Sequence, residues 1–292
     1  MPPRHLLLAV AVMAVWGTNF IVIKTALEHF PPLFLAALRY AFALIPAVFF
    51  LKRPNVSWRV LAAYGMLIGV GQFGVMFYAL RGAISPGMAS LVIQTQVFFT
   101  IGLAMALNRE RLAAHHAAAL ALAAAGFAIV LTRGDFSATP LGVGLVLFAA
   151  LCWAGGNTVA RRAGVSDMLA FVVWSSLFAV PPLLALSLAL EGWPAIAEGV
   201  RTANIASWAA AIWQAAGNTL FGYAAWGWLL ARYPSAAVAP TALLVPVFGM
   251  ASSSLLLQEP MPAWKLLAAG LVLAGLALNF IWPALRRPRA PG

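Results

Sequence analysis

The sequence predicts an all-α polytopic membrane protein with ten transmembrane helices, arranged as two inverted five-helix repeats. Three observations lead to this fold class: the composition, the spacing of the apolar stretches, and a polar motif that recurs half a chain later. The chain of 292 residues is 63% hydrophobic and only 9% charged, whereas a soluble domain carries about 25% charged residues. This small number of charged side chains cannot cover a water-exposed surface. The composition therefore indicates a membrane protein.

The apolar stretches have the length of membrane spans. About 20 apolar residues cross a bilayer as a helix, and short segments rich in proline or charge separate the stretches. The first stretch is longer than the apolar core of a signal peptide and lacks a cleavage pattern, which indicates a retained helix. Nine or eleven spans remain as alternatives. The expected spans are 6–27, 33–51, 58–80, 86–107, 112–132, 140–160, 168–190, 205–230, 234–257 and 263–283.

The positive charges predict the orientation of these spans. With a cytoplasmic N-terminus, twelve arginines and lysines fall at inner ends and loops and four at outer ones, a clear positive-inside bias. Both termini are therefore expected in the cytoplasm. Topology also accounts for the net charge of +11, so the bilayer is the expected partner and nucleic acid is not.

The second half of the sequence resembles the first. Trp16 to Lys24 contains a tryptophan, an asparagine and a basic residue, and the same pattern recurs from Trp153 to Arg162. Similar segments follow in the same order, for example 89–98 and 239–248. The predicted repeats are residues 1–134 and 135–292. Because five is an odd number of spans, the second repeat would cross the membrane in the opposite orientation to the first. Inverted repeats of this kind place a substrate site at their interface near the midplane.

Polar side chains at mid-depth are the candidate binding residues, because such groups usually face a bundle interior or a water-filled cavity. Gln214 and Asn218 lie four residues apart and share one helix face. Hydrogen bonding between helices is the alternative role for any single amide. The predicted substrate-binding residues are Trp16, Asn19, Gln72, Tyr78, Gln94, Trp153, Asn157, Gln214 and Asn218.

Several other residues carry narrower expectations. Pro240 and Pro246 interrupt helix hydrogen bonding and are candidate gating hinges, with plain packing kinks as the alternative. Lys24 and Arg39 are expected to extend toward the outer interface, and binding of a carboxylate is the alternative role.

The fifth and tenth spans are almost wholly apolar and suit the periphery or a dimer contact, so a monomer and a homodimer both remain open. The single cysteine, Cys152, excludes an intramolecular disulfide.

The residues Trp16 to Phe20, Lys24, Pro31-Pro32, Leu38 to Tyr40 and the turn 108–112 resemble the EamA-type members of the drug/metabolite transporter superfamily. The resemblance covers both halves and is better in the first. It implies ten helices in two inverted repeats, cytoplasmic termini, a bacterial inner membrane and export of small metabolites. Bacterial exporters of aromatic amino acids are similar in pattern, and deep aromatic residues beside amides favour such a substrate. Multidrug and nucleoside or other metabolite exporters of the same fold remain alternatives.

Two other function classes are less favoured by the sequence. An intramembrane enzyme would need catalytic groups at depth, yet no protease or hydrolase motif occurs and all acids and histidines fall at span ends or in loops. A structural or channel-forming protein is the other class, and the duplicated polar residues in mid-span count against a merely structural role. We therefore expect no catalytic residue, no metal and no cofactor. Because no carboxylate or histidine lies deep in a span, transport without obligatory proton exchange is expected.

Overall fold

The computed structural model describes residues 1–108, 114–132, 138–233 and 238–285. Within these ranges every regular element is a helix, and the only extended pairing is an isolated bridge between Ile84 and Ala138. Five helical segments are long and apolar enough to cross a membrane, and four shorter apolar helices accompany them. The prediction of an all-α polytopic membrane protein is thereby confirmed at this level.

The helix bounds follow the predicted spans closely. Prolines at first helical positions and the charged or glycine-rich connections mark most ends, as expected for residues that begin or stop helices. The uninterrupted long helices are α1 (Pro3–Ala26), α2 (Pro32–Ala47), α7 (Ala114–Thr132), α8 (Pro140–Arg162), α9 (Met168–Leu190) and α15 (Ala263–Leu285). One short helix was not predicted: α10 (Trp193–Thr202) follows Glu191 and Gly192, whose φ of +82° turns the chain.

The remaining spans are interrupted, and the interruptions recur. A π-helix, η1 (Gly65–Gly74), joins α3 (Trp58–Tyr64) to α4 (Val75–Leu80). A second π-helix, η3 (Gln214–Phe221), joins the segments α11 and α12, which span Ile205–Trp213 and Gly222–Arg232. Such segments are rare and gather at functional sites. They lie in the third and eighth predicted spans, which are equivalent positions in the two predicted repeats.

The fourth and ninth predicted spans share another interruption. A 3₁₀ turn, η2 (Ile93–Thr95), separates α5 (Pro86–Val92) from α6 (Gln96–Asn108). A second 3₁₀ segment, η4 (Ala239–Leu243), precedes α14 (Leu244–Leu257). Irregular backbone therefore recurs in the same order in both halves of the sequence.

Close helix contacts depend on small residues. A Cβ at Gly17 would lie 2.6 Å from the backbone oxygen of Val245, so this glycine lets α1 cross α14 closely. A Cβ at Gly65 or Gly69 would lie 2.4 Å from Ser175 or 2.3 Å from Ala179, so these two small residues let η1 pack closely against α9.

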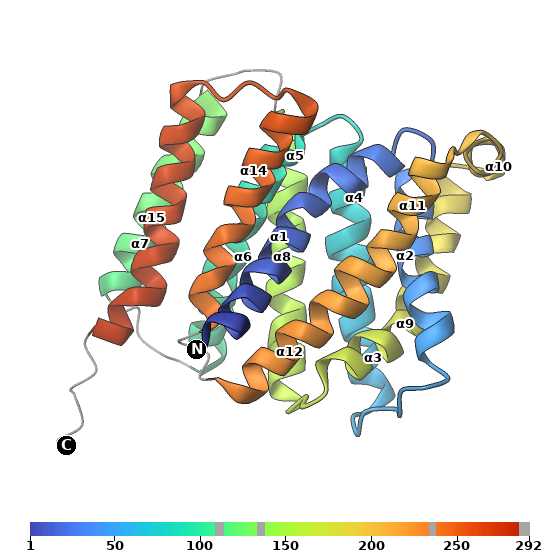
Figure 1. The fold of residues 1–292 in the computed structure, drawn as a ribbon, viewed down its shortest axis with the longest axis horizontal. Helices are drawn as coiled ribbons and strands as arrows, with labels where there is room; N and C mark the ends of the chain where they lie inside the picture. Colours follow the sequence, from blue (N-terminus) through green and yellow to red (C-terminus); the bar gives the residue numbers. More distant parts are fainter. Residues whose placement is uncertain (109–113, 133–137, 234–237, 286–292) are drawn as a thin grey trace.

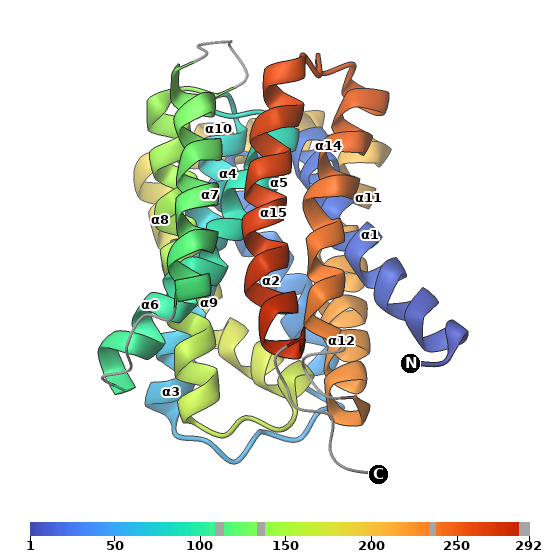
Figure 2. The same ribbon diagram turned by 90° about the vertical axis from the view of Figure 1, so that its left-hand side faces the viewer.

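The pair α7 and α15 stands at one side of the bundle, as Figures 1 and 2 show. This position agrees with the peripheral role predicted for these two apolar helices. The first turn of α1 and the last turn of α15 lie toward the lower end in Figure 1. The opposite end carries α10 and is called the α10 end below.

Candidate functional site

A buried polar cluster joins α1, α2 and η3. The side-chain amides of Asn19 and Gln214 exchange two hydrogen bonds, with Asn19 Nδ2 donating at 3.2 Å and Gln214 Nε2 donating at 2.8 Å. Arg39 Nη1 donates to the same Gln214 Oε1 at 3.0 Å. Asn19, Arg39 and Gln214 are 3%, 1% and 0% exposed. Two of the three residues were predicted, and the structure places them in direct contact.

The position of Arg39 corrects the sequence interpretation. Its side chain was expected to extend toward the outer interface, but it points into the bundle and is almost fully buried. The guanidinium carbon lies 3.7 Å from the centre of the Phe73 ring, within the range of a cation–π contact. Arg39 Nε is buried with no hydrogen-bond partner among the described residues. The second predicted span thus supplies a charged group to the interior.

A second contact joins α1 to the π-helix. Trp16 Nε1 donates to the backbone oxygen of Asn218 at 3.2 Å. A Cβ at position 222 would lie 2.4 Å from that indole nitrogen, so Gly222 makes room for the ring. The Trp16 ring also packs 5.8 and 5.6 Å from the rings of Tyr223 and Trp226. An aromatic cluster therefore lies beside the amide pair, one turn along α1.

The corresponding residues of the second half form looser contacts. Asn157 Nδ2 donates to Gln96 Oε1 at 3.4 Å, and both side chains are half-buried, as is Trp153. Gln94 Nε2 donates at 3.2 Å to the backbone oxygen of Ala242, inside η4. Gln94 therefore joins the interrupted fourth span to the interrupted ninth.

Gln72, Tyr78 and Pro246 are predicted residues that do not join these contacts. Gln72 is buried, yet its Oε1 has no donor among the described residues. Tyr78 is 54% exposed and stays a prediction as a binding residue. Pro246 lies in the first turn of α14, where a missing backbone N–H costs little. Pro240 lies in η4, and its side chain falls outside the described residues. The irregular backbone of the ninth span therefore begins before Pro246.

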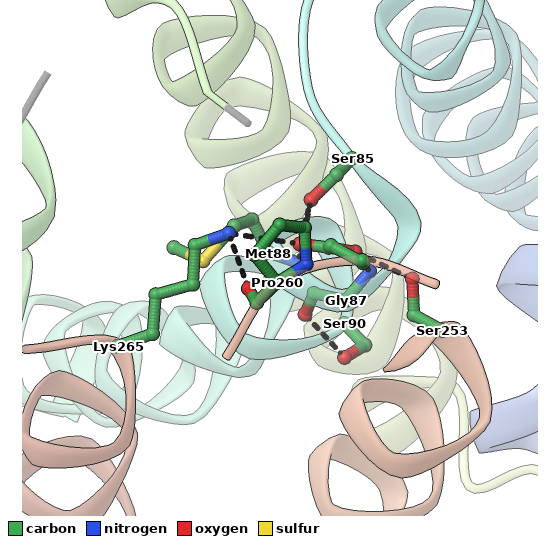
Figure 3. A network of polar contacts seen from close by, with 8 residues as sticks. Ser85, Gly87, Met88, Ser90, Ser253, Pro260 and Lys265 are labelled. Atoms are coloured by element: carbon green, nitrogen blue, oxygen red, sulfur yellow. Dashed lines mark hydrogen bonds and ion pairs between the residues drawn. The ribbon is translucent and has the colours of Figure 1, made fainter. Parts of the chain in front are cut away.

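The α10 end of the bundle carries a carboxylate that sequence analysis placed in a loop. Glu259 is 9% exposed and accepts hydrogen bonds from the hydroxyls of Ser85 and Ser253 and from Gly87 N at 3.3 Å (Figure 3). Lys265 Nζ lies 3.3 Å from Glu259 Oε1 and is fully buried. This lysine was counted among the outer loop charges, but it belongs to α15 and pairs internally.

A second carboxylate repeats the arrangement. Glu191, at the end of α9, accepts from the backbone N–H groups of Leu33 and Phe34 at 2.7 and 3.1 Å. Both α2 and α5 begin with proline, which has no backbone N–H. In each helix, the N–H that follows the proline donates to a glutamate from the second half of the sequence, Glu191 for α2 and Glu259 for α5. Carboxylates are favourable at helix N-termini. A proline start without a local cap, as at Pro31-Pro32, was the available signal for this contact.

The groups described above offer hydrogen bonds and charge. No group of three or more histidines, cysteines or acids could hold a metal ion in the described part of the chain. The interior offers amides, indoles, backbone oxygens of irregular helices and one guanidinium. Such groups can bind a small polar or zwitterionic solute that also carries an apolar surface.

The chain matches a family model described as the EamA-like transporter family, and it does so twice, over residues 4–132 and 140–281. A protein of Salmonella typhimurium named "Probable amino-acid metabolite efflux pump" is 39% identical over 96% of both chains. Its counterpart in Escherichia coli K12 carries the same name and is 38% identical over 93% of both chains.

Two more distant matches extend the comparison. A "Probable terminal-alkyne amino-acid exporter" of Streptantibioticus cattleyicolor is 24% identical over 92% of this chain and 91% of its own. A solved crystal structure without a functional name covers 100% of both chains with a TM-score of 0.67 and 18% identity. That likeness shows the fold alone.

Proposed function

Because this chain belongs to the EamA-like transporter family, and is a multi-pass exporter of the inner membrane rather than an enzyme, we propose that it exports neutral amino acids, aromatic ones first. The proposed mechanism is alternating access between two inverted five-helix repeats, residues 1–134 and 135–292, with both termini in the cytoplasm. The α10 end is then the outer end. The bilayer and the small-molecule substrate are the partners.

The two matches of the family model support the repeat. The recurrence of a π-helix in the third and eighth spans and of a 3₁₀ segment in the fourth and ninth supports it further. Transporters built from inverted repeats place irregular helices around a central site, where freed backbone groups can bind the substrate. Trp16 illustrates this use of backbone, since it bonds the oxygen of Asn218 within η3.

One observation carries the substrate assignment: buried amides and a guanidinium lie beside an aromatic cluster at the centre of the bundle. Asn19, Arg39 and Gln214 supply the polar groups, and Trp16 with Tyr223 supplies flat apolar surface. No carboxylate among the described residues lies within ion-pair distance of Arg39. A cationic drug would meet positive charge there, which favours a zwitterion over the multidrug alternative. The names of the relatives given above agree with this choice.

The arrangement supports a state closed at the outer end. Glu191 and Glu259 each join a helix of one proposed repeat to a helix of the other at that end. At the opposite end of α9, Asp167 caps its own helix by accepting from Ala170 N at 3.0 Å. The outer part of the fourth span, α5, packs against α14, whereas the inner part, α6, packs against α8. The fourth and ninth spans therefore associate at their outer halves.

Export of toxic analogues tests the function. A bacterium expressing the protein should tolerate higher concentrations of toxic phenylalanine or tryptophan analogues than one carrying the Gln214→Leu variant at equal membrane abundance. The variant loses the acceptor shared by Asn19 and Arg39. Tolerance to ethidium-like cations or to nucleoside analogues, with none to amino-acid analogues, would contradict the proposal. Uptake into liposomes that fails to saturate would indicate a channel.

A further inference from the structure

We propose that Arg39 is the binding site for the carboxylate of the exported solute. This inference rests on the proposed function and deepens it, because it states which chemical group the transporter requires. Nothing in the family match or in the names of the relatives assigns a role to this arginine.

The first argument is charge. A guanidinium stays protonated in proteins, and burying an ionised group without a counter-charge costs free energy that only pairing and hydrogen bonding offset. Arg39 is 1% exposed, and it donates to the neutral amide of Gln214. Among the described residues, ion pairs join Arg201 with Glu198 and Lys265 with Glu259, and neither pair includes Arg39. The protein therefore holds a buried positive charge that a bound anion would compensate.

The second argument is geometry. Nη1 donates to Gln214, while Nε is buried and donates to no acceptor among the described residues. Phe73 covers one face of the guanidinium at 3.7 Å, so an anion that pairs with the group in its plane does not compete with this ring. Approach in that plane is how a carboxylate binds arginine, with two parallel N–H···O bonds. The edge that includes Nε is the one left for it.

The third argument is depth. Arg39 lies seven residues after Pro32, the first residue of α2, which places it about 10 Å below the outer end at 1.5 Å per residue. Gln214 opens η3 and Asn19 lies on α1, so the guanidinium touches both proposed repeats at the level where a substrate would be held. A residue that only anchored the protein in the interface would extend toward that end instead.

Competition measurements on the wild-type protein test the requirement for a carboxylate. The uptake of labelled phenylalanine by purified protein in liposomes is measured in the presence of one unlabelled competitor at a time. The competitors are phenylalanine, N-acetylphenylalanine, phenylalaninamide and phenethylamine. The two carboxylates should compete, and the amide and the amine should be weaker by about tenfold or more, since charge-assisted bidentate pairs are the strong ones. Equal competition by all four compounds would overturn the site while leaving amino-acid export intact.

A binding measurement separates the site from the transport activity. Phenylacetate, added to the detergent-solubilised protein, should raise its apparent unfolding temperature, because a ligand of the folded state stabilises it. Arg39→Gln should abolish this shift and Arg39→Lys should retain part of it. The matched control is Arg201→Gln, which removes an exposed arginine of α10 and should leave the shift unchanged.

The two measurements fail in different ways. If phenylacetate stabilises the wild type but not Arg39→Gln, while no amino acid is transported, the anion site stands and the proposed function is wrong. If phenylacetate stabilises neither the wild type nor the lysine variant, and the amide competes as well as the acid, the site is wrong. Should Arg39→Gln fail to fold, the competition panel and Arg39→Lys still decide.

Discussion

Asn19 and Gln214 face each other across the two halves of the sequence and exchange both hydrogen bonds that a pair of side-chain amides can share. The pair is buried, so removing one partner leaves groups of the other unsatisfied, whereas removing both leaves only the Arg39 donor without its Gln214 acceptor. Breaking such a contact costs about 1–2 kcal/mol in model membrane helices and less in some proteins.

The first prediction follows from this pair. Asn19→Leu and Gln214→Leu should each lower the apparent unfolding temperature in detergent, and the double variant should lose less than the sum of the two. Thr158→Ala is the matched control, because that hydroxyl bonds only the Ala154 oxygen on its own helix. Additive effects would show that the amides do not depend on each other.

The second prediction concerns the carboxylate network of Figure 3. Glu259→Ala removes the acceptor that joins α5 to the end of α14, and should loosen the outer end. A cysteine at the buried position Ser90, in a Cys152→Ala background, should then react faster with an impermeant thiol reagent added outside. Glu198→Ala removes an exposed acid of α10 and should not change the rate. An unchanged rate in Glu259→Ala would argue against a closure at this end.

The third prediction maps the proposed cavity. In the same Cys152→Ala background, cysteines replacing Trp16, Trp153 and Asn157 should react with water-soluble reagents, because these side chains are only half-buried. Replacements at Ala121 and Leu271, on the peripheral helices, are the controls and should stay unreactive. Equal labelling of both sets would remove the basis for the site assignment.

The fourth prediction is that transport needs no proton gradient. The deep polar groups of the described residues are amides, hydroxyls, indoles, the Cys152 thiol and a guanidinium, whose reference pKa values suit proton exchange near neutral pH poorly. Outside the spans, the hydrogen bond from Arg201 lowers the pKa of Glu198, so this surface acid stays ionised at neutral pH. Liposomes with matched pH and no membrane potential should still equilibrate the substrate. Accumulation driven by a pH gradient alone would contradict the prediction.

The fifth prediction is topological. Reporter fusions after Arg133 and after Arg289 should lie outside and inside the cell, respectively. The expectation rests on the distribution of positive charge and on five spans per repeat. Reporters on the same side would exclude an inverted repeat.

Local signals in the sequence predicted the spans well. Apolar length, prolines at helix starts and charged turns act within a few residues, so α8 and α9 were expected at 140–160 and 168–190 and lie at Pro140–Arg162 and Met168–Leu190. Asn19 and Gln214 were also singled out, because an amide in an apolar span needs a partner wherever that partner comes from.

Contacts between distant segments could not be predicted in this way. Arg39 was expected near the interface, but its acceptor is Gln214, which lies 175 positions along the chain. Gly87 and Glu259 are separated by 172 positions. The π-helices escaped prediction as well, because no local signal marks the extra residue per turn. Both segments pack against distant helices, η1 against α8 and α9 and η3 against α1 and α2.

Because of the glutamates at the α10 end, the two halves of the chain would differ in stability if each were made as a separate fragment. Both acids come from the second half, and both helices that they cap belong to the first. In a fragment ending near residue 134, the N–H groups of Leu33, Phe34 and Gly87 would lose their carboxylate acceptors, whereas the complementary fragment would keep the pair of Lys265 and Glu259. Gene fission at this junction should therefore yield a first fragment that survives in the membrane only when the second is made beside it.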